Sequence, residues 1–137
     1  MRTPILVWFL LAAGLAGCAD SIIKPLGPEN SEQIDNQPDT FRFQAVDLDN
    51  VHDTRQFTWT NTGTQAAVLH RNFIHHGTVV LMVRDALGTL VDSVPMEYGI
   101  DTETDVGVAG TWQLELRFYG ARGRVDVTLQ RKDPTEE

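Results

Sequence analysis

Hydrophobic and polar residues alternate along most of the chain between residues 41 and 131, which is typical of half-buried β-strands. The segment FRFQAV places Phe41 and Phe43 on one face of an extended chain. The segment QFTWTN does the same with Phe57 and Trp59. No part of this region carries an apolar stripe at helical spacing, so the pattern predicts an all-β domain.

The clearest alternation lies in the segment TWQLELRFYGARGRVDVTLQR. Every second residue is apolar from Trp112 to Phe118, and again from Val125 to Leu129. Because GARG separates the two runs, we predict a tight turn and a hairpin in which Phe118 faces Val125. The same register would place favourable polar pairs on the outer face.

Turn residues between the predicted strands indicate how the strands are connected. Asp85 and Gly88 occupy the first and fourth positions of an expected type I turn, which predicts another hairpin. About seven or eight short strands joined by Gly- and Asp-rich turns predict an antiparallel β-sandwich or jelly roll over residues 41–132, followed by a polar tail at 133–137. The segment GTWQLELRFYGARGRVDVTLQ resembles the closing strands of small jelly-roll modules of the pre-peptidase C-terminal type, which implies the fold but no particular function.

The first residues, MRTPILVWFLLAAGLAGC, are typical of a signal peptide. An arginine precedes an apolar run from Ile5 to Gly17, and small residues close it. As a helix this run would span about 20 Å, short of the roughly 30 Å of a bilayer core, so a stable transmembrane helix is disfavoured. We therefore predict that residues 1–17 form a signal peptide that is removed.

The sequence Leu15-Ala16-Gly17-Cys18 resembles the lipobox of bacterial lipoproteins, and it holds the only cysteine of the chain. The resemblance implies cleavage before Cys18 and acylation of its thiol, so that membrane lipid becomes the anchor. Ala19 follows the cysteine, which by the same resemblance implies the outer membrane, periplasmic side, of a bacterial cell envelope. The alternatives are an ordinary signal peptide with a coincidental cysteine, or a cysteine that is simply a buried apolar residue.

Residues 18–40 are polar, are interrupted by prolines and carry no sustained period, so we predict a lipidated N-terminus followed by a flexible tether. Extended, the tether would reach at most roughly 70 Å. Three apolar residues could instead dock on the domain: Ile22, Ile23 and Leu26.

The charge and the motifs narrow the functional classes. The formal net charge is −8 and the sequence pI is about 4.8, and an acidic chain repels phosphate backbones, so nucleic acid is not expected as a partner. Ser93 is the only serine between residues 41 and 131, and it does not lie in a nucleophile elbow. No phosphate-binding glycine loop is present either, and we expect no enzyme and no catalytic residues.

Two acidic clusters are the candidates for a metal, which would be Ca²⁺, because alternate spacing can turn carboxylates to one side of a loop. Their residues are Asp47, Asp49 and Asp53 in DLDNVHD, and Asp101, Glu103 and Asp105 in DTETD. The simpler interpretation is acidic loop surface without a cofactor. The histidines, including adjacent His75 and His76, lack a metal-binding spacing. Trp59 and Trp112 could stack on a sugar, but their alternation favours burial.

Three functional hypotheses follow. The first is a non-catalytic lipoprotein, anchored through Cys18, whose sandwich binds or scaffolds an unknown envelope protein or glycan. The alternative is a glycan- or calcium-binding module that uses the loops at 47–53 and 95–110. A small enzyme without a recognisable motif is the weakest hypothesis. A polar pocket would favour a ligand, whereas an exposed apolar patch or an open sheet edge would favour a protein partner.

Overall fold

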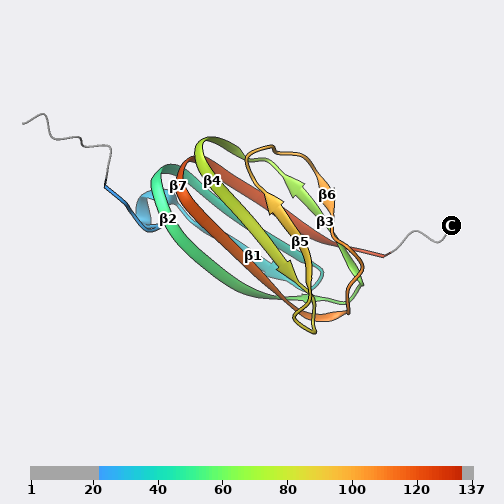
Figure 1. Ribbon diagram of the computed structural model, residues 1–137. Helices are drawn as coiled ribbons and strands as arrows, with labels where there is room; N and C mark the ends of the chain where they lie inside the picture. Colours follow the sequence, from blue (N-terminus) through green and yellow to red (C-terminus); the bar gives the residue numbers. More distant parts are fainter. Residues whose placement is uncertain (1–21, 134–137) are drawn as a thin grey trace, which may run out of the picture.

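The computed structural model describes residues 22–133 (Figure 1). This part of the chain contains seven β-strands and one short 3-10 helix. In chain order they are η2 (Pro28–Asn30), β1 (Gln33–Gln37), β2 (Thr40–Asn61), β3 (Gln65–His70), β4 (Phe73–Arg84), β5 (Leu90–Pro95), β6 (Thr102–Glu103) and β7 (Gly110–Lys132). All strand pairs are antiparallel, so the predicted all-β fold is confirmed. Between residues 22 and 133, no helix has the length and apolarity needed to cross a membrane.

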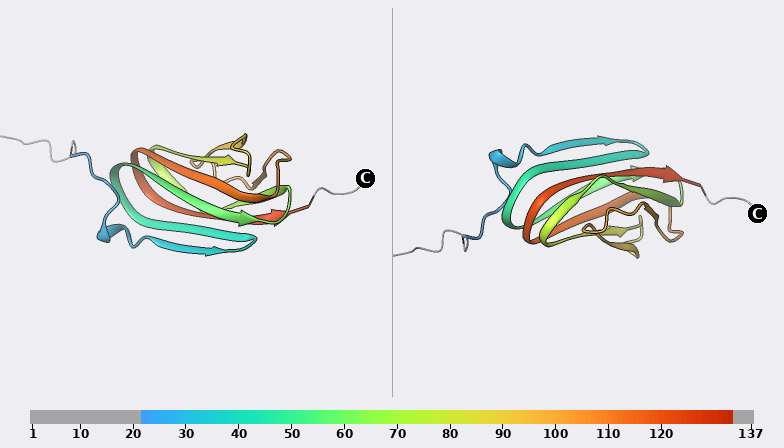
Figure 2. Two further views of the ribbon diagram at one scale, coloured as in Figure 1. Left: turned by 90° about the horizontal axis from the view of Figure 1, so that it is seen from below. Right: turned by 90° about the horizontal axis from the view of Figure 1, so that it is seen from above.

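The strands form two layers because β2 and β7 each contribute to both. In the first layer, residues 40–45 of β2 lie between β1 and residues 125–130 of β7, and β3 and β6 extend the sheet beyond β7. In the second layer, residues 53–61 of β2 pair with residues 110–118 of β7, followed by β4 and β5. Figure 2 shows β1 and the yellow-to-orange region of the chain on opposite sides of the molecule. The architecture is a β-sandwich.

Irregular residues let the two long strands bend from one layer into the other. The β2 register shifts three times between Ala45 and Asp53, and Asp47 and Asn50 adopt positive φ values of 50° and 52°. Extra residues of this kind bend a strand and increase its twist. On β7, Gly123 has φ 126°, and a Cβ there would lie 1.9 Å from the carbonyl oxygen of Phe73. A side chain at position 123 would therefore push β4 away from the bend.

Aromatic residues from both layers fill the core. The rings of Trp59 and Trp112 meet edge to face with centroids 6.0 Å apart, and both side chains are almost fully buried. Phe43 from the first layer packs on Phe57 and Phe118 from the second, at 5.7 and 6.3 Å between centroids. Such pairs contribute about 0.5–1.5 kcal/mol beyond their buried area. The predicted inward faces of both β2 segments are therefore confirmed.

The predicted hairpin around GARG is wrong, because residues 110–132 form one bent strand. Phe118 is buried, but it pairs with Asp53 and Val79, and Val125 pairs with Ala45. Local alternation could not separate the two arrangements, since a tight turn and a bulged bend both shift the inward phase between Phe118 and Val125. The choice between a turn and a bend depends on pairing with β2, which lies far away in sequence.

The flexible tether predicted over residues 18–40 is also wrong in its described part. The backbone N–H of Leu26 donates to Asp53 at 2.9 Å, and the Leu26 side chain is 7% exposed. Residues Pro28–Asn30 form the 3-10 helix and Gln33–Gln37 form an edge strand. The polar, proline-containing composition gave no sign of this strand. A short edge strand needs few apolar residues, because its partner strand supplies the hydrogen bonds.

The turn predicted at Asp85 is confirmed as the β4–β5 connection. The backbone N–H of Gly88 donates to the carbonyl oxygen of Asp85 at 3.0 Å. The Asp85 carboxylate accepts from the N–H groups of Leu87, Thr89 and Val108 at 2.9–3.0 Å. Burial by itself raises the pKa of Asp85, but these backbone hydrogen bonds outweigh it and leave the pKa below its ordinary value.

Candidate functional site

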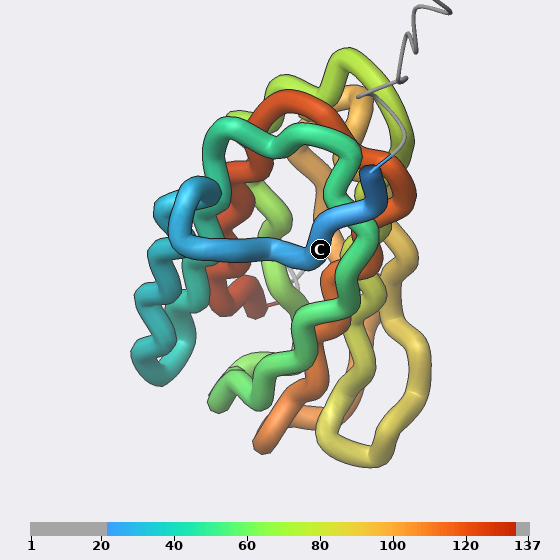
Figure 3. The backbone as a smooth tube through the Cα atoms, turned by 90° about the vertical axis from the view of Figure 1, so that its left-hand side faces the viewer, coloured from blue at the N-terminus to red at the C-terminus, as the bar shows by residue number. Residues whose placement is uncertain are grey.

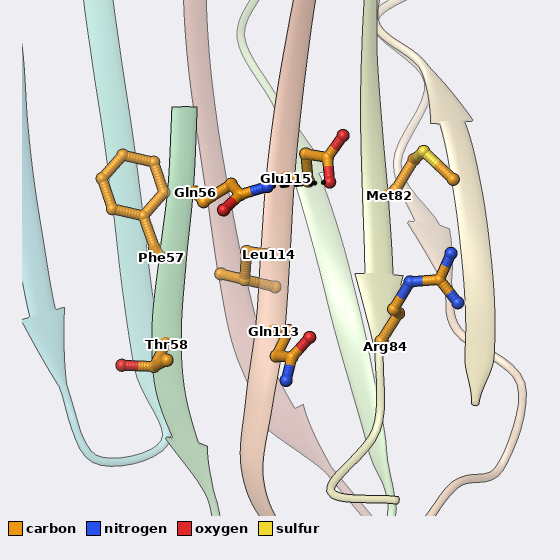
Figure 4. Close-up of a pocket in the computed structure, with 8 residues that line it drawn as sticks. All are labelled: Gln56, Phe57, Thr58, Met82, Arg84, Gln113, Leu114 and Glu115. Carbon is orange, nitrogen blue, oxygen red and sulfur yellow. Dashed lines mark hydrogen bonds between the residues drawn. The ribbon is translucent and has the colours of Figure 1, made fainter. Parts of the chain in front are cut away.

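A polar hollow of about 460 Å³ lies on the outer face of the second layer (Figure 4). Three adjacent strands, β2, β7 and β4, supply its walls. The lining residues are Gln56, Phe57, Thr58, Met82, Arg84, Gln113, Leu114 and Glu115. A volume of this size suits a small ligand or a few units of a chain-like one.

Cross-strand pairing sets the layout of the hollow in two rows. Gln113 of β7 pairs with Thr58 of β2 on one side and with Arg84 of β4 on the other. In the next row, Glu115 pairs with Gln56 and with Met82. Because successive residues of a strand point to opposite faces, these outward residues alternate with buried ones. The rigid core therefore fixes the positions of the polar side chains.

Two hydrogen bonds hold the carboxylate of Glu115, one of the residues that line the hollow. The Gln56 Nε2 donates to Glu115 Oε2 at 3.4 Å, and the Arg117 Nε donates to Glu115 Oε1. The hydrogen bond and the charge of Glu115 raise the pKa of Arg117. At the rim, Arg84 donates to the carbonyl oxygen of Gly88 at 3.3 Å. Amide, carboxylate, hydroxyl and guanidinium groups together can donate to and accept from a ligand rich in hydroxyl groups.

Sequence reasoning missed this hollow. Its residues were visible only as the polar half of an alternating pattern, which any solvated sheet face produces. The hollow arises from residues 56–58, 82–84 and 113–115, which come together only after the three strands pair. No local signal in the sequence could have singled it out.

The carboxylates of the first acidic cluster are not gathered at one point in the described part of the chain. Asp49 pairs with Lys24 and Arg122 at 3.4 and 2.9 Å, and Asp53 accepts from the N–H groups of Leu26 and Thr54. Asp47 is exposed on the bulged bend of β2. These carboxylates serve the contact between the N-terminal segment and β2.

The second acidic cluster is dispersed in the same way. Asp101 accepts from the backbone N–H of His70 at 2.8 Å, which is the main reason that its pKa is lowered. Glu103 forms an ion pair with Lys132, and the N–H of Asp105 donates to Val91. Among residues 22–133, no three His, Cys, Asp or Glu side chains are grouped to hold a metal ion. The structure thus gives no support to the calcium hypothesis.

His70 is the one buried histidine of the described chain, with 2% of its surface exposed. Its Nδ1 lies 2.9 Å from Asn72 Nδ2, and its Nε2 is buried with no hydrogen-bond partner within residues 22–133. Burial lowers the pKa of His70, while the charge of Asp101 opposes this effect and that of Arg71 adds to it. His75 and His76 are exposed, and they lie within β4, which begins at Phe73.

The aromatic residues do not form a sugar-stacking platform in the hollow. Trp59 and Trp112 are 1% and 0% exposed, so the predicted burial is confirmed. Phe57 turns inward onto Phe41 and Phe43. Tyr98 is exposed, but it is not among the residues that line the hollow.

The loops proposed as an alternative site have different surroundings. Residues 47–53 form the bend of β2 against residues 118–123 of β7. The 95–110 connection contains β6 and ends beside the β4–β5 turn, where the N–H of Ala86 donates to Val108 at 3.3 Å. Neither loop lines the hollow, and Cys18, the predicted lipid attachment site, lies outside the described residues.

Comparisons with known proteins leave the family open. No family model matches the chain, and no curated protein matches it. Among solved structures, it is similar to the carbohydrate-binding module CsCBM6-3 from Clostridium stercorarium, which was solved in complex with cellobiose. The identity is 19%, the TM-score is 0.40, and the match covers 83% of this chain and 91% of that chain. A likeness at this level carries no argument about the ligand of this chain.

Proposed function

We propose that this chain is a non-catalytic binding protein of the bacterial cell envelope. It is anchored by lipid on Cys18, at the periplasmic side of the outer membrane, and it binds a hydroxyl-rich ligand such as an envelope glycan in the hollow on β2, β7 and β4. The observation that carries the binding role is the row of polar groups on rigid neighbouring strands, with Thr58, Gln113 and Arg84 side by side.

The chemistry of the hollow favours binding over catalysis. Its eight lining residues include no serine, cysteine or histidine, and the Thr58 hydroxyl lies beside the amide of Gln113, whereas Glu115, the one carboxylate of the lining, pairs with Gln56. Hydrogen bonds to Gln113, Glu115 and Arg84 would select a ligand by its hydroxyl pattern. Since no exposed ring lines the hollow, recognition would depend on these polar groups more than on stacking.

The sequence supports the anchor. An apolar run of signal-peptide length ends in Leu15-Ala16-Gly17-Cys18, and the chain has no second cysteine with which Cys18 could form a disulfide. Mass spectrometry of the protein purified from membranes tests it. An N-terminal Cys18 carrying diacylglyceryl is expected, and an unmodified Cys18 in an uncleaved chain would refute the anchor.

Binding is tested by titrating oligosaccharides and soluble peptidoglycan fragments onto the purified protein. The double variant Gln113→Ala/Arg84→Ala removes two polar groups that point outward, and it should weaken binding about tenfold, at two- to tenfold for each lost hydrogen bond. Gln130→Ala is the matched control, because Gln130 is an exposed glutamine on the part of β7 that belongs to the other layer. Equal affinity of the double variant and the control would place the ligand elsewhere.

A further inference from the structure

Three strand bends and the N-terminal segment meet at one end of the sandwich, opposite the C-terminus (Figures 1 and 3). Asn50 Nδ2 donates to the carbonyl oxygen of Ile22 at 2.9 Å, and Lys24 bridges to Val51. Val51 in turn pairs with Ala121 on the bend of β7. The chain is therefore docked on the domain as far back as Ile22.

This end exposes apolar and cationic side chains together. Ile22, Ile23 and Phe73 are 62%, 66% and 61% exposed. The pairing of Phe73 with Arg124 and of His76 with Arg122 brings the start of β4 against the bend of β7. We call this region the N-terminal surface; its members are Ile22, Ile23, Lys24, Phe73, Tyr119, Arg122 and Arg124.

The charge of this surface differs from that of the chain as a whole. The formal net charge is −8, and loss of Arg2 with residues 1–17 makes it −9. On the N-terminal surface, Lys24 and Arg122 share the carboxylate of Asp49 at 3.4 and 2.9 Å, and Arg124 and Asp47 are exposed nearby. With Asp20 in the segment that leads to Cys18, three cations balance three carboxylates, so this end is close to neutral. An anionic leaflet repels the near-neutral end of an acidic protein less than the rest of its surface, which favours an orientation with this end toward the lipid.

The docked segment leaves little chain between the domain and the proposed anchor. Only residues 19–21 separate Cys18 from Ile22. Four peptide steps reach at most about 14 Å, whatever their conformation. A lipid on Cys18 would therefore hold Ile22, and the end of the sandwich around it, close to the headgroups.

We infer that the N-terminal surface rests on a phospholipid leaflet that carries anionic headgroups. This inference depends on the proposed lipid anchor at Cys18. Ile22, Ile23 and Phe73 lie at the level of the interface, and the cations contact phosphate groups. The hollow lies toward the other end of the sandwich, because Arg84 ends β4 and Gln113 lies near the start of β7, six residues along each strand from the pair Thr78–Tyr119.

Depth-dependent quenching tests this orientation in the lipidated, full-length mature protein. A lipidated Cys18 leaves the chain without a free thiol, so His75→Cys and Leu87→Cys, made separately, can each carry one fluorophore. His75 lies near the N-terminal surface, and Leu87 is 76% exposed at the β4–β5 turn. In vesicles of phosphatidylethanolamine and phosphatidylglycerol with a headgroup quencher, we expect strong quenching at position 75 and little at position 87. Equal quenching would overturn the inference.

A pair of double variants separates the surface from the anchor. Phe73→Asp/Arg124→Glu removes one apolar and one cationic contact, and quenching at position 75 should fall but stay above the level at position 87, because the anchor still holds this end near the headgroups. Leu87→Asp/Lys132→Glu makes the same changes at the other end and should leave quenching at position 75 unchanged. Thermal melting checks that each variant is folded.

Two outcomes distinguish the inference from the proposed function. If mass spectrometry finds no lipid on Cys18, the anchor fails and the orientation fails with it. If Cys18 is lipidated but both labels are quenched equally, or the first double variant has no effect, the anchor stands and the resting surface is refuted.

Discussion

Replacing Leu26 with alanine tests whether the N-terminal segment belongs to the folded domain. Leu26 is 7% exposed and packs in the core cluster, although its segment lies at the margin of the domain. Burial of this kind makes Leu→Ala substitutions cost about 2–5 kcal/mol, and a marginal position, where neighbours can relax, belongs in the lower part of that range. We expect the free energy of unfolding to fall by about 2–3 kcal/mol, which for a domain of this length lowers Tm by roughly 8–13 °C.

Ile23→Ala is the matched control, because Ile23 is an aliphatic residue of the same segment with 66% of its surface exposed. Its free energy of unfolding should change by less than about 0.5 kcal/mol. Urea denaturation followed by tryptophan fluorescence measures both variants, since Trp59 and Trp112 are buried. A Leu26→Ala protein as stable as the Ile23→Ala protein would show that the segment is a tether after all, and the short reach to the membrane would be refuted with it.

Three further predictions concern the interior. Trp112→Ala should lower the free energy of unfolding by about 3–5 kcal/mol in urea denaturation and abolish the near-ultraviolet circular dichroism of the Trp59 pair, because it removes a fully buried ring. The pKa of His70 is lowered in the folded state, so the unfolded state takes up the proton first, and stability should be constant above about pH 6.5 and fall below it; melting curves of His70→Gln should lose that part of the pH dependence. Burial raises the pKa of Asp92 and the charge of Asp105 adds to the effect, so the contribution of Asp92 to stability declines as the pH rises above its unfolded value; Asp92→Asn should raise Tm at neutral pH, and a lower Tm would contradict this.

The inward face of each strand could be read from the sequence, and the partners of the strands could not. Phe41, Phe43, Trp59 and Trp112 are buried as their alternation predicts, because the pleat turns every second residue inward whatever strand lies beside it. The turn at Asp85 was predictable for a similar reason, since its hydrogen bonds are local.

The sequence-based predictions failed where the structure depends on pairing between strands that are far apart in sequence. The glycines of GARG have positive φ at Gly120 and Gly123, which suits a tight turn as well as a bend, and only the pairing with β2 selects the bend. The hollow was missed for the same reason, because Gln56, Met82 and Glu115 meet across three strands that are remote in sequence. Sequence spacing also overstated the acidic clusters, whose carboxylates bind nearby cations and backbone N–H groups.

The two bent strands also set the order in which the chain can fold. Thr40 pairs with Gln130 and Asn61 pairs with Gly110, so neither layer is complete until almost the whole sequence is available. The chain loses the entropy of closing these long loops before the stabilising contacts between the strands form. Folding is therefore slow compared with that of helical domains of the same size. If the chain is exported, as proposed above, this delay has a use. While the C-terminal strand is still in the ribosome or the translocation channel, the rest of the chain would have no partner strand with which to form a stable sandwich, and it would stay in the unfolded form that can be threaded across a membrane.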